Sequence, residues 1–127
     1  MRLFVVRHAE AAPGEPDDLR PLTAAGRDTA RALAERLAPA QPRAVLSSPL
    51  LRARETADPI ARAAGVETEA DERLAPGADA DAVREAVSER GDTVVIVGHQ
   101  PDCGEIVLEL SGREADFPPG GVAEVVL

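Results

Sequence analysis

Both histidines of the chain, His8 and His99, lie within one residue of the end of a short apolar run. Arg7 stands immediately before His8, and Arg52 follows a third apolar run by a few residues. The forked guanidinium group of an arginine can bind two phosphate oxygens at once. An imidazole can attack phosphorus and carry the phosphoryl group covalently. A second imidazole can stabilise the transferring group if it is protonated. These four residues therefore predict phosphoryl-transfer chemistry, provided that the fold brings them together.

The order of apolar runs and helical patterns predicts how these residues are positioned. Strands are expected over 3–6, 43–48, 66–70, 93–98 and 121–127. Helices are expected from Thr23 to Pro39 and over 48–65, 79–91 and 100–112. Alternating strands and helices are typical of an α/β fold with a mostly parallel sheet covered by helices on both faces. Ligands bind beyond the carboxyl ends of such strands, which is where the histidines and arginines would meet.

The expected helix starts add to the same site. We expect Ser48 to cap the second helix, with Pro49 at its first helical position. Pro59 is expected to kink this helix. The next helix start on this edge falls near Pro101, and helix N-termini carry partial positive charge that favours anions.

Composition and charge exclude several classes of protein. The chain has 127 residues and a net charge of -9, which disfavours nucleic acid and anionic membranes as partners. Aromatic residues make up only 2% of the chain, so there is no stacking platform for bases. The first residues are too short an apolar stretch for a signal peptide or a membrane span, so we expect a cytoplasmic protein. The length predicts a single domain over 1–127.

The chain lacks the residues that other phosphatase and hydrolase mechanisms require. Cys103 is the only cysteine, so there is no disulfide framework, and we expect it to be a small core residue. The residue six positions after it is Glu109, not the arginine that a cysteine phosphatase needs. No nucleophile elbow of the G-x-S-x-G type occurs. Two histidines without clustered carboxylates argue against a metallophosphatase, and no cofactor or metal is expected.

Four motifs in order, "FVVRHAEA", "RPLTAAG", "LSSPLLRARETA" and "VIVGHQP", resemble the histidine phosphatase (phosphoglycerate mutase-like) superfamily. Their spacing is most similar to its short SixA-type phosphohistidine phosphatases. The resemblance implies a three-layer α/β sandwich of the phosphoglycerate mutase type. It also implies that His8 is the nucleophile, that Arg7 and Arg52 bind the phosphoryl oxygens, and that His99 completes the pocket. Arg20 matches a position that faces the phosphate in the SixA-type branch.

The roles of two residues, Arg20 and Glu72, have an alternative interpretation. Arg20 can instead form a loop salt bridge with Asp17 or Asp18. Glu72 is the nearest candidate for a general acid, although a surface charge is the simpler interpretation of it. Larger relatives carry that acid within an inserted lid, which this short chain lacks.

The sequence thus predicts a metal-independent phosphatase that hydrolyses phosphohistidine on a partner protein through a phosphohistidine intermediate on His8. An open site without a lid can admit a side chain that stands on another protein. A phosphomonoesterase acting on a small sugar or nucleotide phosphate is the alternative within enzymes. The alternative from another class is a non-catalytic phosphate-binding interaction module.

Overall fold

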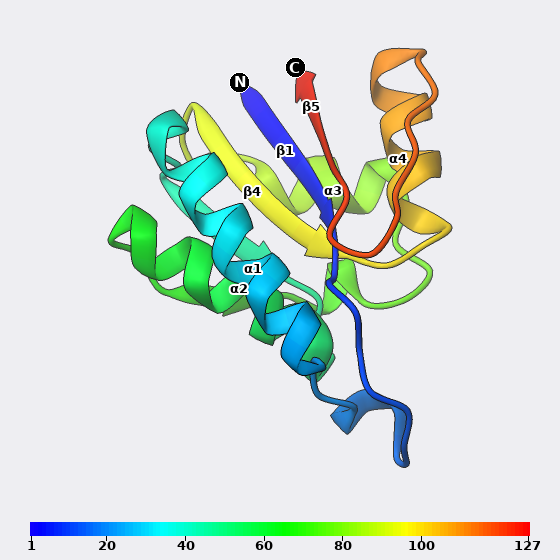
Figure 1. Cartoon of the computed structure of the whole chain (residues 1–127). Helices are drawn as coiled ribbons and strands as arrows, with labels where there is room; N and C mark the ends of the chain where they lie inside the picture. Colours follow the sequence, from blue (N-terminus) through cyan, green and yellow to red (C-terminus); the bar gives the residue numbers. More distant parts are fainter.

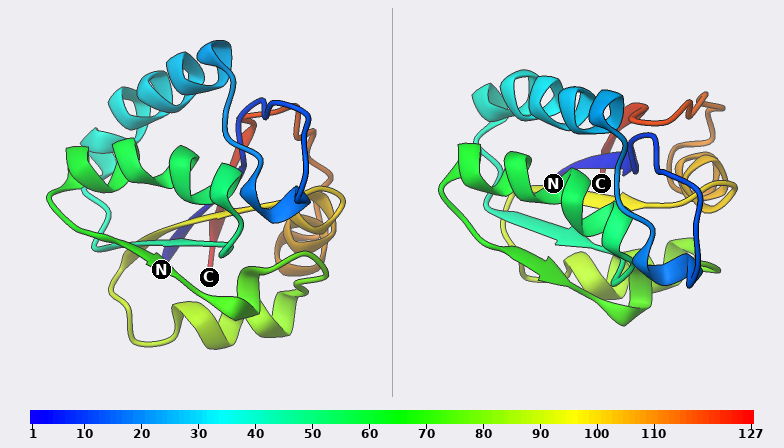
Figure 2. Two further views of the ribbon diagram at one scale, coloured as in Figure 1. Left: turned by 90° about the horizontal axis from the view of Figure 1, so that it is seen from below. Right: turned by 60° about the horizontal axis from the view of Figure 1, so that its bottom comes forward.

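The computed structural model describes all residues 1–127 as one five-stranded sheet with helices on both faces (Figures 1 and 2). The strand order is β3-β2-β4-β1-β5. The strands are β1 (Arg2–Arg7), β2 (Ala44–Ser47), β3 (Thr68–Ala70), β4 (Thr93–Gly98) and β5 (Val122–Val126). The first four are parallel, and β5 is antiparallel to β1 at the edge of the sheet. The three-layer α/β fold expected from the sequence is confirmed.

Four α-helices cover the two faces of the sheet. They are α1 (Ala24–Leu37), α2 (Leu51–Ala64), α3 (Ala80–Val87) and α4 (Asp102–Ser111). Short 3-10 turns, η1 (Asp17–Leu19), η2 (Ala38–Ala40) and η3 (Glu72–Leu74), lie in the connections. Helices α1 and α2 pack on one face, and α3 and α4 lie on the other (Figure 2). None of the helices is both long and apolar enough to cross a membrane.

The strands are continuous apolar runs because both of their faces are buried. In β1, Leu3 and Val5 pack into the core on the α3–α4 side. Phe4 and Val6 alternate with them and pack into the core on the α1–α2 side. This period of two assigns neighbouring residues to different cores, so a shift by one residue would exchange the two sets.

Helix α2 starts later than the sequence pattern suggested. Ser48 was expected to be its cap and Pro49 its first residue, but the helix begins at Leu51. Leu50 holds the N-cap position in an extended conformation and makes no side-chain cap hydrogen bond. The prediction was wrong because the Ser48 hydroxyl bonds with the backbone N–H of Leu50 and with an imidazole instead. The helix continues through Pro59 to Ala64.

The other helix ends agree with the predictions to different degrees. Thr23 caps α1 as expected, accepting a hydrogen bond from the backbone N–H of Gly26 at 3.0 Å. Helix α3 ends at Val87, short of the expected Gly91, because Ser88 leaves the helical conformation and Glu89 has a positive φ of 61°. Helix α4 starts at Asp102, two residues after the expected start.

Candidate active site

Backbone hydrogen bonds place three chemically important residues at one edge of the sheet. Arg7 on β1 lies in register with Gly98 on β4. One residue further on, the backbone N–H of His8 donates to the carbonyl of Gly98 at 3.0 Å. The backbone N–H of Ser48, just after β2, donates to the carbonyl of Val97 at 2.9 Å. The ends of β1, β2 and β4 therefore bring His8 and Ser48 close to His99, which follows Gly98 at the end of β4.

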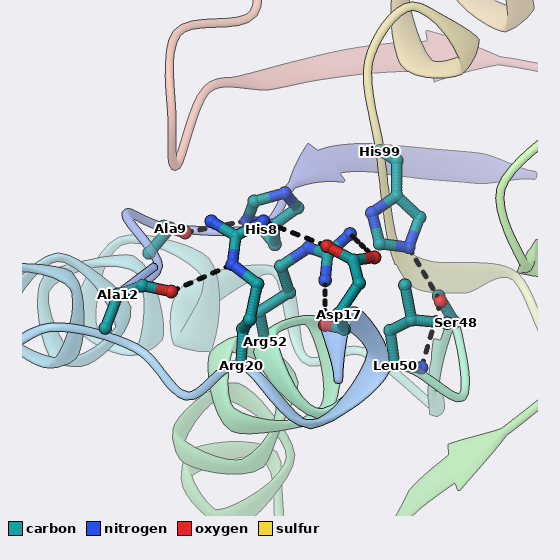
Figure 3. Close-up of polar contacts among 9 residues, drawn as sticks. All are labelled: His8, Ala9, Ala12, Asp17, Arg20, Ser48, Leu50, Arg52 and His99. Carbon is teal, nitrogen blue, oxygen red and sulfur yellow. Dashed lines mark hydrogen bonds and ion pairs between the residues drawn. The ribbon is translucent and has the colours of Figure 1, made fainter. Parts of the chain in front are cut away.

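The two imidazoles face each other at this edge. The ring centroids of His8 and His99 are 5.2 Å apart, with 58° between the ring planes. His99 is 5% exposed, whereas His8 is partly buried. The expectation that two histidines distant in sequence meet in space is confirmed (Figure 3).

The ring orientation of His8 suits a nucleophile. Its Nδ1 lies 2.7 Å from the carbonyl oxygen of Ala9. A carbonyl can only accept, so Nδ1 carries the proton and donates. The lone pair of the neutral ring is then on Nε2. The loop after the histidine is held in turn, because the backbone N–H of Ala9 donates to the hydroxyl of Thr56 on α2 at 3.0 Å.

Arg52 reaches the site from the first turn of α2. It is 8% exposed, and both terminal nitrogens of its fork contact Asp17. Nη1 donates to the backbone carbonyl of Asp17 at 2.9 Å, and Nη2 contacts its carboxylate at 3.3 Å. Helix α2 and η1 are thereby joined across the site (Figure 3).

The sequence left two roles open for Arg20, and the structure shows the salt bridge. It forms the predicted salt bridge, with 3.1 Å between Nη1 and a carboxylate oxygen of Asp17. Its Nε donates to the carbonyl of Ala12 at 2.8 Å. Its positive charge also lowers the pKa of His8. The carboxylate of Asp17 thus lies on the two forks of Arg20 and Arg52 beside the imidazoles (Figure 3).

Arg7 is held from a different segment. Its Nη1 donates to the backbone carbonyl of Phe117 at 3.0 Å, in the loop between α4 and β5. Its Nε is buried and has no hydrogen-bond partner. Arg7 ends β1 directly before His8, and its charge lowers the pKa of both His8 and His99.

Glu72 does not take part in this cluster. Its side chain is exposed on η3 and makes no hydrogen bond or ion pair. The carboxylate that the fold brings to the arginines is instead that of Asp17, which the sequence suggested only as a salt-bridge partner. Asp17 lies three residues before Arg20, and that spacing was the one available signal for it.

Burial favours the neutral form of both imidazoles. Desolvation is the main cause that lowers the pKa of His8, opposed by the hydrogen bond to Ala9 and reinforced by Arg52. Desolvation, followed by the charges of His8 and Arg52, lowers the pKa of His99 to about 4. His99 is therefore uncharged at neutral pH and can donate through only one ring nitrogen, unlike the protonated ring considered from the sequence.

Cys103 lies under the site and is inert. It is 2% exposed, and its thiol points to the carbonyl of Val6 at 3.7 Å. Burial raises the pKa of this thiol to about 12, so the reactive thiolate does not form at neutral pH. The expectation of a small core residue is confirmed. No group of three or more His, Cys, Asp or Glu side chains is arranged to hold a metal ion.

The fold and this edge define an α/β protein whose sheet presents two imidazoles and several guanidinium groups to one space. Residues 3–76 match the histidine phosphatase superfamily (branch 1). An uncharacterised protein of Picosynechococcus sp. (strain PCC 7002) is 38% identical, with 96% of this chain and 82% of the relative covered. The chain therefore belongs to the histidine phosphatase superfamily, whose members are phosphatases.

Solved structures agree with this assignment. The protein histidine phosphatase SixA complexed with tungstate is 30% identical, with a TM-score of 0.88 over 100% of this chain and 88% of that one. A putative phosphohistidine phosphatase SixA from Agrobacterium tumefaciens is 28% identical, with a TM-score of 0.81 over 97% and 89%. A mycobacterial glucosyl-3-phosphoglycerate phosphatase is 23% identical, with a TM-score of 0.68 over 88% and 80%, and shares the fold.

Proposed function

We propose that this protein hydrolyses phosphohistidine on a partner protein, through a covalent phosphohistidine intermediate on His8 and without a metal ion. The observation that carries the proposal is the orientation of His8. Its Nδ1–H donates to Ala9, which leaves the lone pair of Nε2 free, and its ring faces His99 at 5.2 Å. A lone pair beside several guanidinium groups is suited to attack a phosphoryl group.

The reaction takes place in two displacements at phosphorus. Nε2 of His8 forms a bond to phosphorus while the bond to the substrate's leaving nitrogen breaks. The substrate ring carries a proton on its other nitrogen, so it leaves as neutral imidazole with that electron pair. Water then attacks the phosphorus of phospho-His8, the P–Nε2 bond breaks, and inorganic phosphate leaves. Arg7, Arg20 and Arg52 bind the phosphoryl oxygens, while His99 donates a hydrogen bond to the transferring group. The overall charge of -9 makes this local positive cluster necessary for binding an anion.

The choice of a protein-bound phosphohistidine as substrate rests on the leaving group and on the extent of the structural match. An imidazole leaving group is far less basic than an alkoxide, so P–N cleavage needs less help from a positioned acid. Glu72, the candidate for that acid, lies outside the cluster, which favours a substrate with a good leaving group. The chain also matches SixA over its whole length, whereas its likeness to the glucosyl-3-phosphoglycerate phosphatase concerns the fold.

Turnover of a protein carrying phosphohistidine, compared with a panel of sugar and nucleotide phosphates, tests this proposal. We expect the phosphohistidine protein to give the highest kcat/KM and the rate to be unchanged by a chelator. Preferential turnover of a small phosphomonoester would support the second enzyme candidate. Binding of inorganic phosphate without any turnover would instead support an interaction module.

A further inference from the structure

Ser48 is fully buried between the end of β2 and the start of α2, in contact with His99. Its Oγ lies 2.7 Å from Nε2 of His99, and it accepts a hydrogen bond from the backbone N–H of Leu50 at 3.2 Å. These are the side-chain hydrogen bonds of this hydroxyl. The other ring nitrogen of His99, Nδ1, lies on the side that faces His8 (Figure 3).

The hydrogen-bonding needs of the hydroxyl decide which partner donates. The bond from Leu50 uses the oxygen of Ser48 as an acceptor, so the hydroxyl hydrogen still needs an acceptor of its own. Nε2 of His99 is the acceptor within reach. If Nε2 carried the proton instead, a buried hydroxyl hydrogen would remain unpaired, which is unfavourable.

We propose that Ser48 is a positioning residue that donates to Nε2 of His99 and thereby fixes the imidazole proton on Nδ1, facing the phosphoryl site. The inference deepens the proposed function and rests on it for its catalytic meaning. The two rings then present different groups to the same space: a lone pair on Nε2 of His8 and an N–H on Nδ1 of His99.

This arrangement matters because a neutral imidazole has one donor and one acceptor. With the proton on Nδ1, His99 can donate to an oxygen of the transferring phosphoryl group, whose negative charge needs donors. With the proton on Nε2, the ring would turn a lone pair toward the same oxygens. Ser48 therefore selects the productive form without touching the substrate.

Nitrogen-15 NMR of histidine-labelled protein tests the proton's position directly, because the chain contains only two histidines. In the wild type at neutral pH we expect both rings to carry the proton on Nδ1. A wild-type His99 protonated on Nε2 would overturn the proposal, and this readout needs neither a variant nor enzymatic activity. The tautomer result therefore stands apart from the fate of the proposed function.

Variants connect the tautomer to catalysis. In Ser48→Ala we expect His99 to lose its fixed Nδ1–H form and kcat to fall about ten- to a hundredfold with little change in KM. Ser47→Ala is the matched control, since Ser47 is equally buried but its hydroxyl donates to the backbone carbonyl of Ser48 at 2.9 Å. Ser47→Ala should keep the wild-type tautomer.

A double-mutant cycle separates positioning from a structural role. If Ser48 acts through His99, Ser48→Ala should cause no further loss of kcat in a His99→Ala background. Ser48→Thr keeps the hydroxyl and should retain both the tautomer and most of kcat. Equal losses from Ser48→Ala in the presence and absence of the imidazole would contradict the proposal.

Discussion

The two ends of the parallel strands carry different chemistry on the same scaffold. At the carboxyl ends, two imidazoles meet several guanidinium groups near the N-termini of α2 and α4. At the amino ends, a hollow of ≈720 Å³ lies beside the C-termini of α1 and α2. Its charged lining residues are one arginine, Arg43, and one aspartate, Asp92, and it contains no histidine.

We infer from this difference that a hollow alone does not make a site for an anion. Helix C-termini carry partial negative charge, which disfavours a phosphate at the amino ends of the strands. Arg43 is exposed there, whereas Arg52 is 8% exposed at the opposite edge. A buried fork is held in one geometry by its contacts, and this makes it a better binder of phosphoryl oxygens.

The matched pair Arg52→Ala and Arg43→Ala tests this contrast most strongly. We expect Arg52→Ala to lower kcat/KM about a hundredfold or more, because it removes the guanidinium group that we propose binds the transferring group. Arg43→Ala should stay within about twofold of the wild type. Arg52→Lys keeps the charge but loses the paired donors, and should remain severely impaired. Similar losses from Arg43→Ala would mean that the two edges do not differ as described.

The burial of His99 predicts how stability depends on pH. Its pKa is about 4 in the folded protein and 6.5 for an ordinary histidine, so the unfolded chain binds a proton first. The stabilisation is complete above pH 6.5 and is lost as the pH falls toward 4, by on the order of 3 kcal/mol. Urea unfolding at pH 7 and pH 4 measures this loss. In His99→Gln the loss over that range should be smaller by about that amount; an equal loss in both proteins would contradict the expectation.

Replacing Asp17 is expected to give the smallest effect of the three predictions. Its effect on anion inhibition distinguishes an anion site from a simple salt bridge. Its carboxylate contacts the guanidinium groups of Arg20 and Arg52, so we expect an incoming phosphoryl group to displace it. We expect Asp17→Asn to tighten inhibition by tungstate or phosphate by about three- to tenfold. Asp18→Asn is the control, because Asp18 makes no side-chain contact with these arginines. A large loss of kcat in Asp17→Asn would instead assign the carboxylate a role in the chemistry.

Local pattern and sheet topology explain what could be predicted. The apolar runs before His8 and His99 predict parallel strands, and parallel strands end at one edge, so the meeting of the rings follows from the sequence. The position of Asp17 does not follow, because the loop from Ala9 to Thr23 has no periodicity and is placed by long-range contacts such as that with Arg52.

Ser48 was misinterpreted for a different reason. A serine before a proline is also typical of a helix cap, and only the spatial neighbour His99 reveals the other role of the hydroxyl. Glu72 was considered because it follows a middle strand, where larger relatives carry their general acid. Its exposed position on η3 depends on the turn after β3, which residue type alone does not determine.

Trapping of the phosphoenzyme tests the central claim most directly. Protein is incubated with a labelled phosphohistidine substrate, quenched, and the label is located by digestion in the wild type and in His8→Ala. We predict a single labelled residue, His8, with a bond that is labile in acid and stable in alkali, and no label in His8→Ala. A label that persists in His8→Ala, or one that is lost in alkali as an acyl phosphate would be, would contradict the account.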